Sequence, residues 1–176
     1  MEIDRETLQK ARELDSGAVS ELVKIIYPEI FRYFFYHTPS REDAEDLTGE
    51  VMLRMVKGLK RQKGDFRAWI FRISRNLLTD YYRKRGKVKT IPLDEVGEGE
   101  WKREGKEDNF RPEEWNRFLA RLSPEQREVV ILRFFEGYSL KEVAEIMGKG
   151  EGAVKLLQFR ALKNLREILK KEGERI

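Results

Sequence analysis

Three carboxylates have the clearest capacity for chemistry: Asp43, Asp46 and Glu50 are spaced at i, i+3 and i+7. On a helix this spacing places them on one face, and carboxylate oxygens are ligands that Mg²⁺ prefers. A metal-dependent nuclease built on this face is therefore one hypothesis. However, His37 is the only histidine, and no second acidic cluster complements the three. The competing interpretation is a negative ridge that binds a basic partner.

Catalysis has no other support in the sequence. The chain has no Gly-rich phosphate loop of the P-loop type and no visible nucleophile–base pair. We therefore expect that the protein is not an enzyme and uses no metal and no cofactor.

A second pattern lies between Asp65 and Arg85, where aromatic and basic residues are dense. On a helix, one stripe combines an aromatic ring, guanidinium groups and an amide, at Trp69, Arg72, Asn76, Thr79 and Arg83. A ring can stack on an unpaired base, an amide can read a base edge, and basic side chains can hold phosphates. The stripe predicts binding of DNA whose strands have separated. Alternatively, Trp69 is a boundary residue that packs under the adjacent loop.

A third pattern lies near the C-terminus. "SPEQ" at 123–126 and "SLKE" at 139–142 are helix-start signals, and Gly137 and Gly148 are helix stops. A longer helix from Glu151 completes a helix-turn-helix, whose second helix enters the major groove of DNA. The residues facing DNA would be Glu151, Gly152, Ala153, Lys155 and Leu156, then Gln158, Phe159 and Arg160, with Lys149 and Lys163 on the backbone. The alternative is a plain helical hairpin.

The elements that position these residues are helical, and no segment reads as a convincing strand. We expect an all-α protein with two small helical domains, an N-terminal helical bundle over 1–86 and a C-terminal helix-turn-helix domain over 113–176. Residues 87–112 form a charged, Gly-containing linker, in which Trp101 and Phe110 are candidates for docking on a neighbouring surface.

Several signals set the helices of the first domain. A short helix should close near Gly17, and Pro28 should kink or restart the next one because it removes a backbone donor. Ser40 is a candidate cap for the third helix, and Asp65 for the fourth, which carries the aromatic stripe.

Charge is unevenly distributed along the chain. The formal net charge is only +4, but residues 54–89 hold 13 Lys/Arg against 2 Asp/Glu, and residues 149–176 hold 8 against 4. Two basic blocks suggest two contacts with a polyanion, with solvated helix faces as the alternative. The chain has no cysteine, no apolar run of membrane length and no signal-peptide pattern, so it reads as intracellular.

Together these residues resemble a bacterial sigma factor of the extracytoplasmic-function group. The motifs are "DAEDLTGEVMLRMVKGL", "FRAWIFRISRNLLTDYYRKR" and "LSPEQREVVILRFFEGYSLKEVAEIMGKGEGAVKLLQFRAL", in the family's order and spacing. The resemblance implies a sigma factor that binds core RNA polymerase, directs it to −10 and −35 promoter elements and assists promoter melting. A stand-alone helix-turn-helix regulator is the alternative, but it leaves the basic, aromatic block unexplained.

The resemblance also implies site residues. Binding to the polymerase clamp helices falls on Asp43, Asp46, Leu47, Glu50, Val51 and Arg54. Contacts with the opened −10 element fall on Lys63, Phe66, Trp69, Arg72, Asn76, Thr79, Asp80, Arg83 and Lys84, with Asn76 at the position that reads a flipped base. The helix from Glu151 matches the −35 reader.

The implied partners are core RNA polymerase, through its clamp helices and flap, and promoter DNA, both duplex and single-stranded. An anti-sigma factor is a further class of partner, since such proteins often hold family members. No membrane insertion is expected, and the implied location is the bacterial cytoplasm, associated with the nucleoid.

The sequence departs from the family pattern at two places. Gly49 stands where glutamine is common, and "VKLLQFRAL" replaces the frequent "VKSRLHRAR", which introduces Leu156, Leu157 and Leu162. The family's −35 sequence preference therefore does not carry over, and whether Leu156 and Leu157 are core or partner surface stays open.

Overall fold

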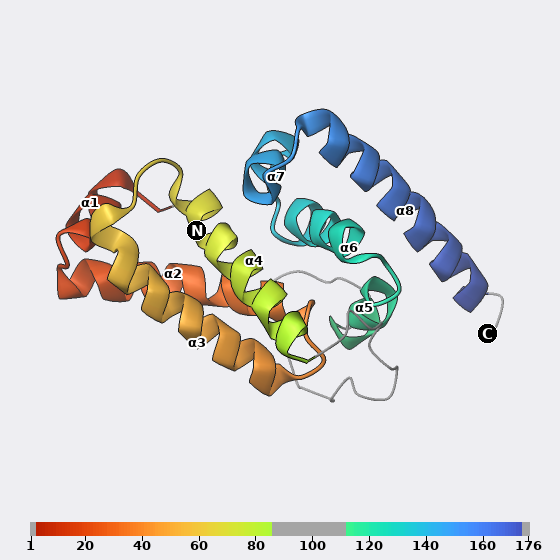
Figure 1. The fold of residues 1–176 in the computed structure, drawn as a ribbon, viewed down its shortest axis with the longest axis horizontal. Helices are drawn as coiled ribbons and strands as arrows, with labels where there is room; N and C mark the ends of the chain where they lie inside the picture. Colours follow the sequence, from red (N-terminus) through yellow and green to blue (C-terminus); the bar gives the residue numbers. More distant parts are fainter. Residues whose placement is uncertain (1–2, 86–111, 174–176) are drawn as a thin grey trace. The chain divides into compact units, whose positions relative to one another are not determined.

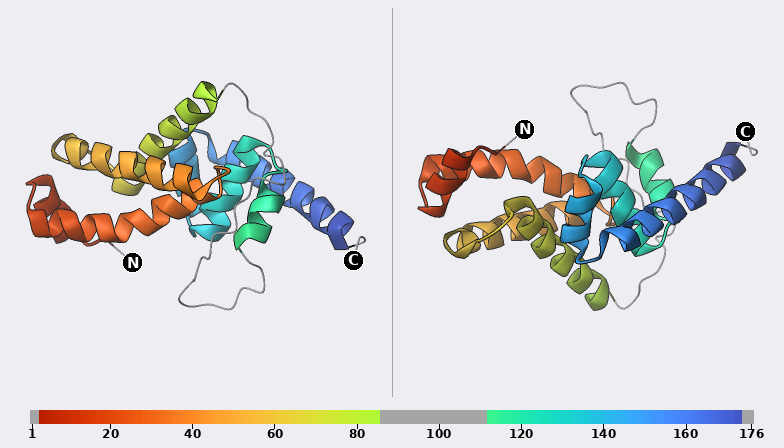
Figure 2. Two further views of the ribbon diagram at one scale, coloured as in Figure 1. Left: turned by 90° about the horizontal axis from the view of Figure 1, so that it is seen from below. Right: turned by 90° about the horizontal axis from the view of Figure 1, so that it is seen from above.

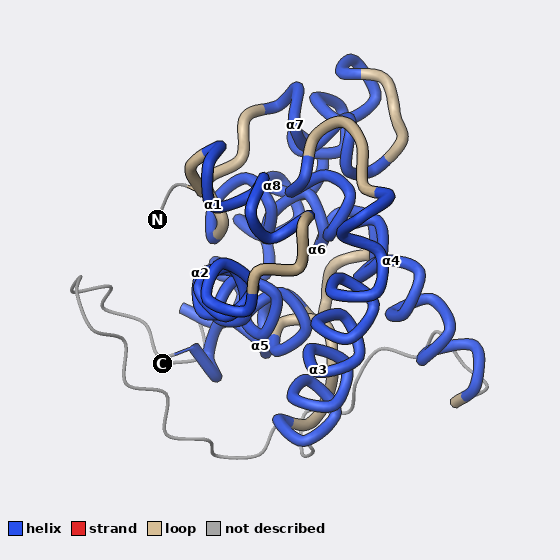
Figure 3. The backbone as a smooth tube through the Cα atoms, turned by 90° about the vertical axis from the view of Figure 1, so that its left-hand side faces the viewer, coloured by secondary structure: helices blue, strands red, loops and turns tan. Residues whose placement is uncertain are grey.

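The computed structural model describes residues 3–85 and 112–173, and within them every regular element is a helix (Figure 3). These residues form two compact units. The first unit contains α1 (Arg5–Arg12), α2 (Ser16–Phe35), α3 (Arg41–Gly58) and α4 (Phe66–Lys84), and the second contains α5 (Pro112–Leu119), α6 (Pro124–Val130), α7 (Leu140–Met147) and α8 (Glu151–Gly173) (Figure 1). The segment Phe35–Arg41 groups with the second unit.

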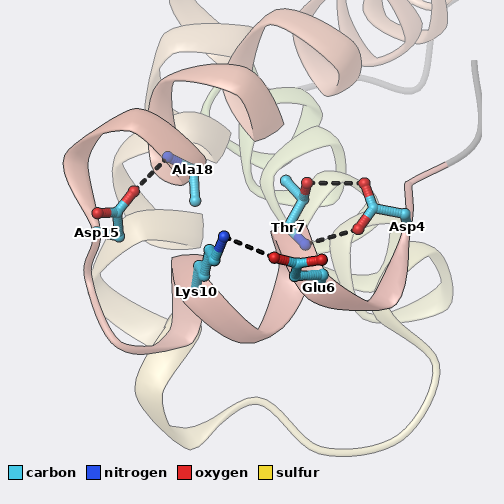
Figure 4. Close-up of polar contacts among 6 residues, drawn as sticks. All are labelled: Asp4, Glu6, Thr7, Lys10, Asp15 and Ala18. Carbon is cyan, nitrogen blue, oxygen red and sulfur yellow. Dashed lines mark hydrogen bonds and ion pairs between the residues drawn. The ribbon is translucent and has the colours of Figure 1, made fainter.

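The first helix begins at a side-chain cap (Figure 4). Asp4 accepts a hydrogen bond from the Thr7 backbone N–H at 2.8 Å, and this bond holds the pKa of the Asp4 carboxyl below its ordinary value. Lys10 pairs with Glu6 one turn earlier at 2.7 Å. Because these side chains are exposed, the pair contributes little to stability.

The first helix is shorter than the sequence predicted. It ends at Arg12, and Leu14 adopts a positive φ of 62° in the turn that follows. Asp15 then accepts a hydrogen bond from the Ala18 backbone N–H at 2.8 Å (Figure 4). Gly17 therefore lies in the first turn of α2, because the cap at Asp15 starts the new helix before the glycine.

The prediction that Pro28 restarts the second helix is wrong, since α2 continues through it from Ser16 to Phe35. Proline in a helix interior removes one backbone hydrogen bond and costs about 3 kcal/mol. Ile26 and Ile30 flank Pro28 and are almost fully buried. Burial of such side chains, worth about 1.5–3 kcal/mol each, offsets the cost.

The core of the first unit is rich in aromatic residues. Tyr33 makes edge-to-face contacts with Phe34 and with Phe71 of α4, each with 5.4 Å between ring centroids. Met55 and Leu59, at the end of α3 and in the short 3-10 turn Leu59–Arg61, are also fully buried. α2 and α3 lie alongside each other (Figure 2), and the Tyr33–Phe71 contact fixes which face of α4 points inward.

The capping signals of the second unit are confirmed. Ser123 caps α6 with Pro124 at its first position, and Ser139 and Glu142 form a reciprocal capping box at the start of α7. α7 ends at Gly148, whose φ of 62° is left-handed. The helix predicted to run to Gly137 has two parts, α6 and a π-helical turn over Ile131–Phe135.

The linker predicted over 87–112 lies outside the described residues except for Pro112, the first residue of α5. Trp101 and Phe110 lie outside them as well. α5 is a helix that the sequence analysis did not distinguish.

Candidate nucleic-acid interface

The stripe predicted on α4 lies on the surface of the first unit. Asp65 caps the helix as predicted, accepting a hydrogen bond from the Ala68 backbone N–H at 2.6 Å. Starting the helix at Phe66 turns Ile70 and Phe71 into the core and leaves Arg72, Asn76 and Thr79 exposed. The cap therefore fixes where the helix begins, and the packing of Phe71 against Tyr33 fixes which side chains it leaves exposed.

Trp69 is half-buried, and the structure shows what supports its ring. A Cβ atom at Gly58, the last residue of α3, would lie only 2.7 Å from Cζ2 of Trp69, so the indole rests directly against the glycine backbone. Phe66 is buried, with its ring centroid 5.8 Å from that of Trp69. Phe66 was expected among the DNA contacts, but its burial makes it a support for Trp69.

The remaining −10 residues are accessible to different degrees. Lys63, Arg83 and Lys84 are exposed, and Asp80 is half-buried in a pair with Arg83 at 2.8 Å. The Thr79 hydroxyl donates to the Arg75 carbonyl at 2.9 Å, which leaves its oxygen able to accept. In the described part of the chain, the Asn76 amide makes no intramolecular hydrogen bond. The stripe thus combines an amide, a supported ring and several cations on one accessible face.

The acidic ridge predicted on α3 is only partly accessible. Asp46 and Arg54 are exposed, Leu47 and Glu50 are half-buried, and Arg54 donates to Glu50 at 2.6 Å. Val51 is fully buried, so its expected place at the polymerase interface is wrong for the first unit as it is folded. The i+4 step from Leu47 turns Val51 into the core.

Leu53 was missed by the sequence analysis. It lies on α3 and is 58% exposed. Leu53 lies three positions after Glu50 and therefore falls outside the stripe of apolar residues that α3 buries. An apolar residue outside that stripe could have indicated a binding surface from the sequence.

Asp43 is held inside the first unit. Its carboxylate accepts hydrogen bonds from the Tyr81 hydroxyl at 2.8 Å and from Arg85 at 3.0 Å. The Arg85 guanidinium also lies over the Tyr81 ring, 4.6 Å from its centroid. Burial, and then the bond to Asp43, raise the pKa of Tyr81 well above its ordinary value. The carboxylate therefore joins the start of α3 to the end of α4, a link that the sequence analysis missed.

The predicted −35 reader, α8, has a clear inner and outer face. Val154 and Ala161 are fully buried and anchor it. The expected base-facing residues are exposed, namely Glu151, Gly152, Ala153, Lys155, Leu156, Phe159, Arg160 and Lys163. Lys149 is half-buried and pairs with Glu125 at 2.8 Å.

Gln158 is the exception on α8. It is half-buried, and its Oε1 accepts a hydrogen bond from Nε of Arg133 at 3.0 Å. Arg133 also donates to the Tyr138 carbonyl. The amide expected to read a base edge is therefore engaged within the second unit, by an arginine that the sequence analysis did not select.

Within residues 3–85 and 112–173, no three His, Cys, Asp or Glu side chains lie together as a metal site would require. Nor do the described helices include one that is long and apolar enough to cross a membrane.

Comparison with known families gives two matches. The family model for Sigma-70 region 2 matches residues 22–88, and the model for Sigma-70, region 4 matches residues 118–167. The ECF RNA polymerase sigma factor BldN of Streptomyces coelicolor is 33% identical over 171 residues, covering 93% of this chain. The chain belongs to the extracytoplasmic-function sigma factors.

The chain spans 65% of the length of BldN. Two sigma factors of Bacillus subtilis are matched over more of their length. SigV is 29% identical, and the match covers 82% of this chain and 86% of SigV. SigX is also 29% identical, and the match covers 83% of this chain and 82% of SigX.

Solved structures share the fold of this sigma factor. CnrH, solved in complex with the cytosolic domain of CnrY, aligns over 96% of this chain and 97% of its own with a TM-score of 0.75 and 22% identity. The sigma factor RpoE from Bartonella quintana was solved with the anti-sigma factor NepR. It aligns over 86% of this chain and 96% of its own length, with a TM-score of 0.70 and 24% identity.

Two sigma-factor regions in the family order favour a sigma factor over a stand-alone helix-turn-helix regulator. Such a regulator would require only the second match. The first match covers the aromatic, basic helix that the regulator hypothesis left unexplained.

Proposed function

We propose that this sigma factor binds core RNA polymerase through the outer face of α3, captures the opened −10 element on α4 and reads the −35 element with α8. The chain itself performs no catalytic step. The proposed polymerase contacts are Asp46, Leu47, Glu50 and Arg54, and Leu53 joins them as an exposed apolar residue among charges. The bacterial nucleoid is the proposed place of action.

One observation carries the proposal. α4 presents the supported ring of Trp69, the exposed amide of Asn76 and the cation of Arg72 on one accessible face. Asn76 is exposed and its amide makes no hydrogen bond within the described residues, so a ligand can use the amide and the ring together. An unpaired base offers a plane to the ring and an edge to the amide, and its phosphates suit the cations.

The energetics limit what the chain can do alone. Separating about ten base pairs costs on the order of 14 kcal/mol, at ~1.4 per stacking step. Capturing two bases on side chains returns roughly 2–6 kcal/mol. The free chain should therefore bind promoters weakly and melt them only with polymerase. Tight, specific melting by the chain without polymerase would contradict the proposal.

Run-off transcription with core polymerase tests the proposal directly. Adding the chain should produce transcripts from specific promoters, identified by sequencing transcripts after its overexpression. The absence of a promoter-specific transcript from every target would instead favour the stand-alone regulator.

Asn76→Ala separates base reading from polymerase binding. The variant should lose most run-off transcription and keep its affinity for core polymerase, because Asn76 is exposed on α4 and its loss leaves no cavity. Thr79→Ala serves as a milder neighbour, since the Thr79 hydroxyl is already bonded to the Arg75 carbonyl. Equal loss of transcription and polymerase affinity in Asn76→Ala would count against base reading.

An anti-sigma protein is a further proposed partner. The two solved structures with similar folds each contain a protein partner, and the second partner is named as an anti-sigma factor. Co-purification of the chain at native expression level, followed by release of transcription activity when the partner is removed, would test this part.

A further inference from the structure

The outward face of α8 is apolar at its centre. Leu156 is 48% exposed and Phe159 is 67% exposed, whereas Val154 and Ala161, on the opposite face, are fully buried. Gly152, one turn before Leu156, has no atom within 4 Å of where a Cβ would lie. Residues at i, i+3 and i+4 share a helix face, so a smooth apolar strip occupies the first turns of the proposed −35 reader.

The hydrogen-bonding groups of this segment lie away from that centre or are engaged elsewhere. Gln158, the only amide in the first two turns of α8, bonds to Arg133 and is half-buried. Glu151 and Arg160 are exposed at the margins of the strip. A base that faces the centre of α8 therefore meets carbon, not a donor or an acceptor.

The surroundings of the strip identify its ligand. Lys155 and Arg160 are exposed on its two sides and Lys163 is exposed one turn beyond Phe159, so the apolar centre has a cationic border. Cations on both sides of an apolar strip suit a polyanion that carries apolar groups at its surface. In the major groove of DNA, the apolar group at a base edge is the C5-methyl of thymine.

We propose that Leu156 and Phe159 are specificity-determining residues that contact thymine methyl groups in the major groove of the −35 element. The inference rests on the proposed function of α8, and it names the chemistry that α8 recognises. The upstream element of this sigma factor should then contain thymines at the base pairs that face the two side chains.

Deoxyuridine is the direct probe, because it differs from thymidine only by the missing methyl and pairs in the same way. Reconstituted holoenzyme would first be incubated with a random-sequence duplex library, and the retained duplexes sequenced to define the enriched upstream element. That element would then be rebuilt with deoxyuridine at each thymine in turn. Loss of one contacted methyl should weaken holoenzyme binding about four-fold, and loss of two about fifteen-fold.

Matched variants assign the effect to the two side chains. Leu156→Ser and Phe159→Ser should each lose the preference for thymidine over deoxyuridine at one thymine position and keep it at the other, and both should fold because the side chains are exposed. Leu162→Ser removes another exposed leucine of α8, beyond the first turns, and should keep the wild-type preference. Lys163→Ala should weaken binding to both duplexes alike and reduce the slope against salt by about one.

The possible results distinguish failure of this inference from failure of the proposed role of α8 in binding the −35 element. If no upstream element is enriched, the proposed role of α8 fails and the inference fails with it. If an element is enriched but deoxyuridine binds as well as thymidine, the inference alone is overturned, and the proposed role of α8 stands. Loss of the preference in Leu162→Ser would also overturn it, because the effect would then not depend on the strip.

Discussion

Replacing Gly58 by alanine tests whether the contact between the Trp69 ring and the Gly58 backbone controls capture of an unpaired base. A Cβ at position 58 would lie 2.7 Å from Cζ2 and 3.1 Å from Cη2 of the indole. Ordinary carbon–carbon contacts lie at about 3.5–4.0 Å, so the ring must retreat by roughly 1 Å. The backbone at Gly58 is right-handed (φ −94°, ψ −14°), so alanine adds no backbone strain of its own.

The expected effect falls on DNA binding more than on stability. Stacking of a base on an aromatic ring is worth about 1–3 kcal/mol, so losing it should weaken holoenzyme binding to opened DNA about five- to 150-fold. Alanine is favoured over glycine in a helix by about 1 kcal/mol, which opposes the steric displacement of Trp69. The free energy of unfolding should therefore change little. Affinity for core polymerase should persist, since the nearest atoms to the added methyl all belong to Trp69 and not to the exposed side chains of α3.

The assay is holoenzyme binding to a fork-junction DNA that is duplex upstream and single-stranded across the −10 element, with urea unfolding of the free chain beside it. Gly49→Ala is the matched control, because a Cβ at Gly49 meets no atom within 4 Å on the same helix. It should raise stability by up to about 1 kcal/mol and leave fork binding intact. Wild-type fork binding by Gly58→Ala would refute the reasoning, as would equal losses in both variants.

The remaining predictions concern α3 and its link to α4. Asp46→Lys should weaken core polymerase binding about ten-fold or more, since like charges across an interface cost several kcal/mol, and unchanged affinity in a pull-down titration would remove Asp46 from the interface. Asp43→Asn should lower the free energy of unfolding by about 1 kcal/mol in urea, non-additively with Tyr81→Phe, while sparing polymerase affinity. If Asp43→Asn lowers the free energy of polymerase binding by more than it lowers the free energy of unfolding, Asp43 contacts polymerase directly. The raised pKa of Tyr81 means that the folded state holds the phenolic proton more tightly, so stability present below pH 10.0 should fall as the pH rises above it. Tyr81→Phe should reduce that fall in urea midpoints measured across the alkaline range, and an identical decline in the variant would contradict the assignment.

The helix caps and helix ends of this protein could be predicted from the sequence because each depends on residues only a few positions apart. The caps at Asp65, at Ser123 and at Ser139 with Glu142 each join residues three positions apart, and Gly148 ends α7 by its own conformational freedom. Most residues that the helix-turn-helix pattern placed toward DNA at the start of α8 are exposed, with Gln158 as the exception. The family motifs, which are also contiguous, carried the function.

The sequence failed where one element had to meet another. Val51 and Phe66 were expected at interfaces and yet are buried, since packing against other helices decides which flank of a helix is covered. The run through Pro28 stayed one helix because burial on both sides of it outweighs the lost hydrogen bond.

What the sequence by itself determined, then, was the helical fold class and the starts of α4, α6 and α7. Only the tertiary structure decided that Gly58 seats Trp69, that Asp43 is bonded to Tyr81, and that Arg133 engages Gln158. Each of these pairs joins residues on different elements, and a contact between residues far apart in the sequence produces no periodic pattern in it. Those contacts decide which exposed side chains remain available to bind DNA.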